Sequence, residues 1–295
     1  MAAAADAKAA QMPFIKNLAS SDRKLRTQSL SALQSFLSAC PPLAGAEAAK
    51  LWTGLYYALW MTDRPRPQQA LAADLAALLL TSLRDPRCAA PWLRGFWAVL
   101  SAQWPRVDAL RMDKFLLLVR RVFAAQLRWV RERGYCDPAA PADAKDEGKE
   151  EDEEEEEERE YKEGRDPVED VMRVLEQCTF DADEEFRTAL GLRLHVLDLW
   201  VDELEREGCL TPLTSAADAD KEARRAAFVA RVGDMVERLR RSPVKSVRAR
   251  AQESYDDERL PWGTPADAED DEDEDMGDAG QDDDDSEDGW GGIKD

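Results

Sequence analysis

Residues 51–67 read LWTGLYYALWMTDRPRP, and this stretch decides the fold class most directly. Over 46–62, apolar and aromatic side chains cover nearly every face of a helix, which is typical of a helix buried among others. The sequence DRPRP then ends that helix. Pro65 and Pro67 suit the first turn of a following helix, because a proline there sacrifices no helical hydrogen bond. The stretch therefore predicts two consecutive helices joined by a tight turn.

Helical periodicity extends from this stretch in both directions. Further helices are predicted before residue 40, over 68–83, 91–103, 108–133, 184–207 and 218–241, and from the Asp-Pro pair at 166–167. Alternating β-branched runs and Asn-Gly or Asp-Gly hairpin turns are absent from the sequence. Although no strict repeat is visible, the pattern predicts an all-α fold of stacked antiparallel helices, an α-solenoid of the HEAT-like kind.

The charge of the chain is concentrated in two segments. The 295 residues include 62 acidic and 40 basic ones, a formal net charge of −22. Residues 146–160 hold 12 acidic and 2 basic residues, and 267–288 hold 15 acidic and no basic ones, whereas 1–135 hold 19 basic and 9 acidic ones. Acidic blocks this dense repel themselves and bury too little apolar surface to fold. We therefore expect a basic helical body with a disordered acidic insert and a disordered acidic C-terminal tail.

These patterns divide the chain into parts. They are a flexible N-terminus (1–12), an N-terminal helical half (13–135), a disordered acidic linker (136–165), a C-terminal helical half (166–241), and a basic segment followed by the acidic tail (242–295). The N-terminus lacks the features of a secretory signal, and the longest uncharged apolar stretch, 51–62, is too short for a membrane span. Five separated cysteines without zinc spacing favour a reducing compartment.

Sequence signals for catalysis are weak. His195 is the only histidine, so a two-histidine metal site within the chain is excluded. Phosphate-loop, HExxH and nucleophile-elbow motifs are absent. His195 shares a helix face with Asp198 and Asp202, but a histidine on the polar seam of a helix is the more common arrangement. We predict a protein that is not an enzyme and that binds no cofactor and no small-molecule substrate.

Two sets of residues are candidates for binding. A candidate partner or RNA surface comprises Asp63, Arg64, Arg66, Arg111, Lys114, Arg121 and Arg128. Basic side chains in a line can follow a nucleic-acid backbone, although an ordinary solvated helix face has the same composition. A candidate nuclear-localisation signal or phosphate-binding patch comprises Arg238, Arg240, Arg241, Lys245, Arg248 and Arg250, for which a solvated helix end is the plain alternative. Charge reversal at Arg111 and Lys114 is expected to leave the fold intact and to lower partner binding.

Four segments carry a resemblance to a known family. They are FIKNLA (14–19), LWTGLYYALWMTDRP (51–65), the stretch from Phe96-Trp97 through Trp104 to VDALRMDKF (107–115), and GLRLHVLD (191–198) followed by Asp202-Glu203-Leu204. Over residues 13–210 the chain resembles the nucleolar ribosomal RNA-processing protein 1 family. The resemblance implies a helical-repeat protein of the nucleus and nucleolus, bound to pre-ribosomal particles of the large subunit. It also implies a need for the protein in ribosomal RNA processing, without cutting RNA itself.

Two functional hypotheses follow. The first is a non-catalytic ribosome-assembly scaffold. The second is an acidic chaperone or adaptor for basic ribosomal proteins or histones, in which the acidic segments bind the partner. Deleting 146–160 and 267–288 separates the two hypotheses, because only the chaperone would lose all binding. Most of a set of six aromatic residues are expected in the core, and Trp262, just before the tail, can pack back on the body. The six are Trp52, Tyr56, Trp60, Phe96, Trp97 and Phe115.

Overall fold

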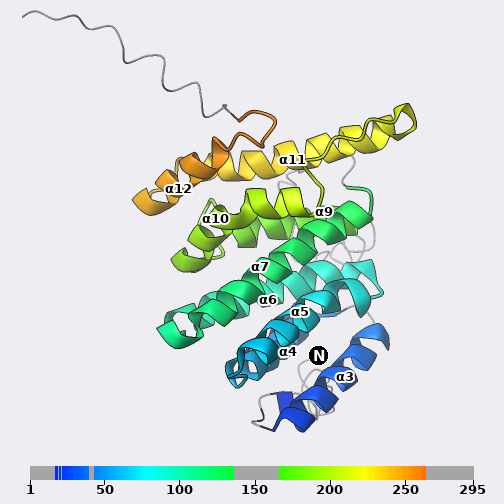
Figure 1. Ribbon diagram of the computed structural model, residues 1–295, viewed down its shortest axis with the longest axis vertical. Coiled ribbons are helices and arrows are strands. Elements are labelled where there is room, and N and C mark those ends of the chain that lie inside the picture. The colour runs from blue at the N-terminus through cyan, green and yellow to red at the C-terminus, as the bar shows by residue number, and fades with distance from the viewer. Residues whose placement is uncertain (1–16, 19, 21, 40–42, 136–165, 264–295) are drawn as a thin grey trace, which may run out of the picture.

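The computed structural model describes residues 17–18, 20, 22–39, 43–135 and 166–263, and every regular element in these ranges is helical (Figure 1). The α-helices are α3 (Arg23–Ala39), α4 (Gly45–Trp60), α5 (Pro65–Thr81), α6 (Ala89–Gln103), α7 (Ala109–Glu132), α9 (Pro167–Val174), α10 (Leu190–Arg206), α11 (Ala219–Leu239) and α12 (Lys245–Tyr255). Shorter elements are the 3₁₀ turns η1 (Pro86–Cys88), η2 (Trp104–Arg106) and η4 (Ala216–Asp218), and the π-helical turn η3 (Leu175–Phe180). The predicted all-α fold class is confirmed.

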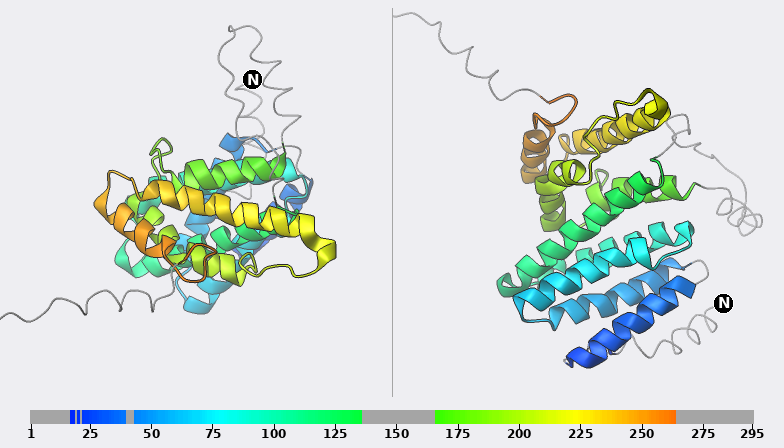
Figure 2. Two further views of the ribbon diagram at one scale, coloured as in Figure 1. Left: turned by 90° about the horizontal axis from the view of Figure 1, so that it is seen from above. Right: turned by 45° about the vertical axis from the view of Figure 1, so that its right-hand side comes forward.

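The helices form two layers that lie face to face, and within each layer they are stacked along the long axis of the molecule (Figures 1 and 2). In one layer α4 packs against α6 and α6 against α9, while η3, which continues α9, packs against α11. In the other layer α5 packs against α7, α7 against α10 and α10 against α12. Each helix thus packs mainly on the helix two places further along the chain, as in a helical solenoid. The N-terminal and C-terminal halves are separated in sequence by 136–165 but pack directly on each other.

Local sequence signals set most helix ends. Pro65 lies in the first turn of α5, as its fixed backbone angle favours. The side chains of Asp108 and Asp166 cap α7 and α9 by accepting hydrogen bonds from backbone N–H groups of the first turn. Gly134, with φ +84°, follows the end of α7 in a conformation that favours glycine.

Aromatic side chains join the helices within and between the layers. Trp52 of α4 is fully buried, packs on Trp92 and Phe96 of α6, and donates its indole N–H to the carbonyl oxygen of Trp92 at 2.9 Å. Between the layers, Tyr56 of α4 stacks on Phe115 of α7 with ring centroids 4.7 Å apart. The expected core positions are confirmed for Trp52, Tyr56, Phe96, Trp97 and Phe115, whereas Trp60 is only partly buried.

The segment before α10 differs from the sequence prediction. The helix expected from residue 184 begins at Leu190, and residues 181–189 form a loop. Asp181 adopts φ 48°, and its carboxylate accepts hydrogen bonds from the backbone N–H groups of Phe186 at 3.1 Å and Thr188 at 2.8 Å. An aspartate that bonds its own local backbone favours a turn over a helix.

The helical stack also continues beyond residue 241, where the sequence analysis places only a basic segment and a tail. α12 buries Val247 and Ala251 and packs on α10 and α11. Trp262 packs back on the body, as expected: its ring lies 5.3 Å from that of Tyr255 and close over Gly233. The N-terminal segment 1–12 and both acidic segments, 146–160 and 267–288, lie outside the described residues.

An ion pair fixes the connection between α10 and α11. Glu222 accepts a hydrogen bond from the backbone N–H of Leu213 at 2.8 Å and pairs with Arg225 at 2.5 Å. Arg225 also donates to the carbonyl oxygen of Cys209 at 2.6 Å. The hydrogen bonds from Arg225, and then that from Leu213, lower the pKa of Glu222 to about 2.

This depressed pKa predicts a pH dependence of stability. A carboxyl group with a lowered pKa stabilises the folded state above its unfolded pKa, and this contribution is lost as the pH falls through the folded pKa. Glu222→Gln is therefore expected to lower the free energy of unfolding at pH 7 and to weaken its decline between about pH 5 and pH 2. Urea unfolding across that range tests the expectation, with Asp234→Asn on the same helix as the control. Parallel pH profiles for the wild type and Glu222→Gln would contradict it.

Candidate binding surfaces

The turn between α4 and α5 meets the start of α7, so part of the predicted partner surface does come together. Asp63, Arg64 and Arg66 are exposed in this turn. Arg111 of α7 pairs with Asp108 and places its guanidinium 4.6 Å from the centre of the Trp60 ring. These residues form one polar edge of the molecule.

Lys114 requires a correction, because it is not part of that exposed surface. Only 4% of the residue is exposed. Its ammonium group donates hydrogen bonds to the carbonyl oxygens of Trp60 at 2.8 Å and Thr62 at 3.0 Å, at the C-terminal end of α4. Burial lowers the pKa of Lys114, while the nearby carboxylate of Asp63 raises it. A cation at the carbonyl end of a helix is a stabilising arrangement, so Lys114 has a structural role. The expectation that charge reversal at Lys114 leaves the fold intact is therefore wrong.

Arg121 and Arg128 lie further along α7, in a groove on the layer formed by α5, α7 and α10. This central groove has a volume of about 560 Å³ and is formed by α5, α7 and α10. Its lining residues are Ala73, Ala76, Ala77 and Leu80 of α5, Leu117, Arg120, Arg121, Ala124, Ala125 and Arg128 of α7, and Glu203, Arg206 and Glu207 at the end of α10. The sequence strip from Arg111 to Arg128 thus contributes to two separate surfaces.

Carboxylates of α10 hold most of the arginines in the central groove. Arg128 forms a two-pronged ion pair with the buried Glu207, with N–O distances of 2.8 and 2.9 Å. Arg120 pairs with the fully buried Glu203, and Arg206 contacts the same carboxylate at 3.2 Å. Arginine and carboxylate match each other's planar geometry, so these pairs fix α10 relative to α7.

Two groups in the central groove are incompletely bonded. Arg121 makes no ion pair with any described residue, and its Nε atom is buried without an acceptor. Glu203 keeps its Oε2 atom buried without a donor. Leaving a buried polar atom unsatisfied costs about 1–3 kcal/mol. Arg121 and Glu203 therefore keep unused hydrogen-bonding capacity in the groove.

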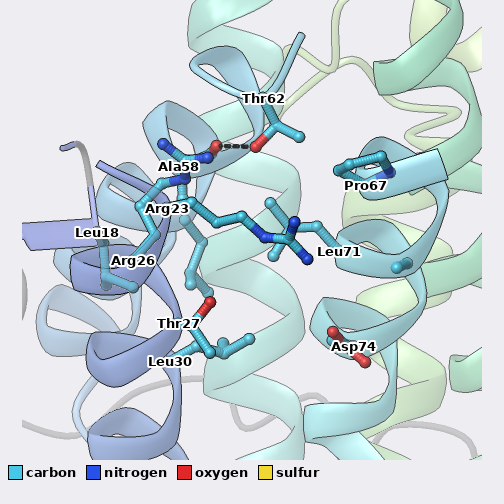
Figure 3. A pocket seen from close by; sticks show the side chains of 12 residues that line it. Leu18, Arg23, Arg26, Thr27, Leu30, Ala58, Thr62, Pro67, Leu71 and Asp74 are labelled. Atoms are coloured by element: carbon cyan, nitrogen blue, oxygen red, sulfur yellow. Dashed lines mark hydrogen bonds between the residues drawn. The ribbon is translucent and has the colours of Figure 1, made fainter. Parts of the chain in front are cut away.

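A smaller hollow of about 140 Å³ lies between α3, α4 and α5. Figure 3 shows Arg23 and Arg26 of α3 on one side and Leu71 and Asp74 of α5 on the other. Arg26 donates to the carbonyl oxygen of Ser20 at 2.8 Å, so one of the two cations is engaged locally. The hollow has no counterpart among the predicted site residues.

The basic run at the end of α11 and in α12 is folded into the body. Most of its cations have partners: Arg238 pairs with Glu176, Arg250 with Asp198, Arg240 bonds Gln252, and Arg248 bonds the carbonyl oxygens of Ser242 and Pro243. Arg241 and Lys245 are exposed and make no ion pair with any residue that the structure describes. Arg241 and Lys245 are thus the two cations of the run whose side chains lack both an ion-pair and a hydrogen-bond partner among the described residues, and they lie where α11 ends and α12 begins.

The chemically reactive side chains of the described residues are mostly buried. His195 lies half-buried, with Nε2 3.1 Å from the carbonyl oxygen of Leu116, and burial lowers its pKa. Cys88, Cys178 and Cys209 are buried, and burial raises the pKa of the Cys178 thiol to about 12. No group of three or more His, Cys, Asp or Glu side chains in the described ranges could hold a metal ion. None of the described helices is both long and apolar enough to cross a membrane.

Comparison with known proteins decides the family. The family model described as nucleolar protein, Nop52 matches residues 9–290, nearly the whole chain. The chain belongs to the Nop52 family. The resemblance seen in the tryptophan-rich segments is thereby confirmed.

Individual relatives of this Nop52-family chain are more distant. The human ribosomal RNA processing protein 1 homolog B is 24% identical over 204 residues, which cover 68% of this chain and 23% of the relative. The Caenorhabditis elegans homolog is 27% identical over 218 residues, covering 70% of this chain and 45% of the relative. The mouse homolog A is 29% identical over 130 residues, covering 42% and 26%. The chain thus spans less than half the length of these relatives.

Several residues of the central groove were not predicted from the sequence. Arg120, Arg206, Glu203 and Glu207 were not predicted as site residues, although they fix the geometry of the groove, and Glu203 entered only through the family resemblance. One signal was present: Glu203 and Glu207 are four residues apart and therefore share a helix face. Which basic helix this face would meet is a tertiary property that the spacing does not encode.

Proposed function

We propose that this chain acts in ribosomal RNA processing as a non-catalytic scaffold that binds the precursor of the large ribosomal subunit in the nucleolus. Membership of a family described as a nucleolar protein supports the place, and relatives named ribosomal RNA processing protein 1 support the process. The scaffold part of the proposal rests chiefly on one observation. The central groove is a preformed surface with an arginine that has no partner in the described structure.

The architecture suits a docking role. Ion pairs between α7 and α10 and between α9 and α11 join successive helices within each layer, including Arg231 with Glu169 at 2.6 Å. Stacked helices of this kind present long continuous surfaces with little rearrangement. The exposed edge at Asp63, Arg64 and Arg66 gives a second surface for the particle.

Depletion and rescue test the proposed function. Loss of the protein from its own cells is expected to cause spacer-containing precursors of large-subunit RNA to accumulate, and the wild-type chain to restore the normal pattern. Northern hybridisation with spacer probes measures this. An unchanged precursor pattern after depletion would reject a role in processing.

The same cells separate the scaffold from the other hypotheses. A chain lacking 146–160 and 267–288 is expected to keep its association with the precursor particle, whereas an acidic chaperone would lose it. Purified chain incubated with a spacer-containing transcript is expected to leave the RNA intact. Cleavage that depends on His195 would instead indicate an enzyme.

Nuclear entry through the basic run is a further expectation of this proposal. Arg241→Glu combined with Lys245→Glu changes the two cations of the run that lack partners in the described structure, so the fold should be retained. The nuclear share of a fluorescent fusion is expected to fall, while Arg84→Glu, an exposed change elsewhere, leaves it unaltered. An equal nuclear share for both variants would show that the basic run is not the nuclear-import signal.

A further inference from the structure

The floor of the central groove is apolar and lies close to the helix backbones. Ala73 and Ala77 of α5 and Ala124 of α7 carry only methyl groups and are half-buried, as are Leu80 and Leu117. Small side chains leave room for another helix to approach closely, as at other helix-in-groove interfaces. From Leu117 to Arg128 the floor spans about 16 Å of α7, which is three helical turns.

The charges of the central groove suit one acidic group better than a chain of phosphates. Arg120 and Arg206 share an ion pair with Glu203, and Arg128 pairs with Glu207. A phosphate backbone requires several free cations along its path, because each neutralised phosphate adds to the affinity. Among the described residues the groove offers one cation without an ion pair, Arg121.

The unsatisfied atoms point to a ligand with both acceptors and donors. Arg121 lacks an acceptor for Nε, and Glu203 lacks a donor for Oε2. Glu203 lies beneath Arg206, whose side chain is 59% exposed and so is able to move aside. A polypeptide helix can supply both groups, a carboxylate for Arg121 and a hydrogen-bond donor for Glu203.

We propose that the central groove binds an α-helix from a protein of the precursor particle, with small apolar residues on its docking face and an acidic residue opposite Arg121. This inference rests on the proposed function for the source of the partner. It replaces the expectation that Arg121 and Arg128 follow an RNA backbone.

Site-specific photocrosslinking in purified precursor particles tests the proposal. Two variants carry benzoylphenylalanine in the groove, one in place of Ala77 and one in place of Ala73. A third variant carries it in place of the exposed Ala230 of α11 and serves as the control. The groove positions are expected to give an adduct that is destroyed by protease and resists ribonuclease. Mass spectrometry then identifies the crosslinked segment, and the control position should not label that segment.

The identified segment is next made as a synthetic peptide and bound to the purified full chain. It is expected to gain helical circular dichroism on binding, and Arg121→Glu and the milder Arg121→Gln to weaken binding at least tenfold. Arg84→Glu, which changes an exposed charge away from the groove, serves as the matched control and should bind as the wild type does. Circular dichroism of the free variants establishes that they are folded.

The remaining outcomes contradict the inference. A ribonuclease-sensitive adduct would assign the groove to RNA, and an adduct with residues 146–160 would assign it to the chain's own acidic segment. Absence of an adduct at both groove positions, or peptide binding indifferent to Arg121→Glu, would also reject it. If the chain does not associate with precursor particles at all, the proposed function itself fails. Failure of the proposed function is thus distinguishable from failure of the helix-binding proposal, in which the chain still associates with the particle.

Discussion

Lys114→Glu is expected to lower the free energy of unfolding by about 3–5 kcal/mol, because it places a carboxylate against two buried carbonyl oxygens. In the wild type the ammonium group of Lys114 donates to the carbonyl oxygens of Trp60 and Thr62. The substitution removes both donors and adds like charge at the negative end of α4. Urea unfolding followed by circular dichroism measures the loss.

Two variants show which part of that loss is electrostatic. Lys114→Met keeps the length of the side chain without charge and is expected to cost about 1–3 kcal/mol, the penalty of unsatisfied carbonyl groups. Arg64→Glu reverses an exposed charge in the neighbouring turn and should change stability by less than about 0.5 kcal/mol. If Lys114→Glu proved as stable as Arg64→Glu, the buried placement of Lys114 would be wrong.

Trp52→Ala is expected to destabilise the fold by about 3–5 kcal/mol, the range for a buried tryptophan. Trp52 is fully buried between α4 and α6, and its loss leaves a cavity beside Trp92 and Phe96. The carbonyl oxygen of Trp92 also loses its indole donor. Thermal and urea unfolding both measure the effect.

Tyr57→Ala is the matched control on the same helix. Tyr57 is 39% exposed, so its truncation removes much less buried surface. Equal losses for the two variants would mean that the contact between α4 and α6 is not a main source of stability.

Most of the fold could be predicted because its signals are local. The apolar run over 51–62 indicates a buried helix, and Pro65 and Pro67 fix the start of the next one. The Asp-Pro pair at 166–167 likewise gives the start of α9. These signals depend on neighbours within a turn or two, which the sequence displays directly.

The missed elements depend on contacts distant in sequence. α12 is polar over most of its surface and is held by two buried residues, Val247 and Ala251, so its apolar stripe is too narrow to stand out. The loop over 181–189 is fixed by Asp181, and Arg193 of α10 donates to the Asp181 carbonyl oxygen at 3.1 Å. Neither the packing of α12 nor the contact between Arg193 and Asp181 produces a periodic pattern in the sequence.

The candidate site was predicted in part for a related reason. Arg111, Lys114, Arg121 and Arg128 share one strip of α7, and periodicity treats them as equivalent. Their neighbours differ: α4 covers Lys114, α10 supplies Glu207 to Arg128, and Arg121 remains without a partner in the described structure. Only the packing of other helices distinguishes a structural lysine from a free arginine.

Co-sedimentation of one charge-reversed variant with large-subunit precursors tests the central claim most directly. Arg121→Glu alters the unpaired cation of the central groove, and Arg84→Glu alters an exposed cation outside it. The account predicts that Arg121→Glu, while folded, moves from the particle fractions of a sucrose gradient to the free-protein fractions, and that Arg84→Glu stays with the particle. If Arg121→Glu sediments with the particle as the wild type does, the groove is not the docking surface.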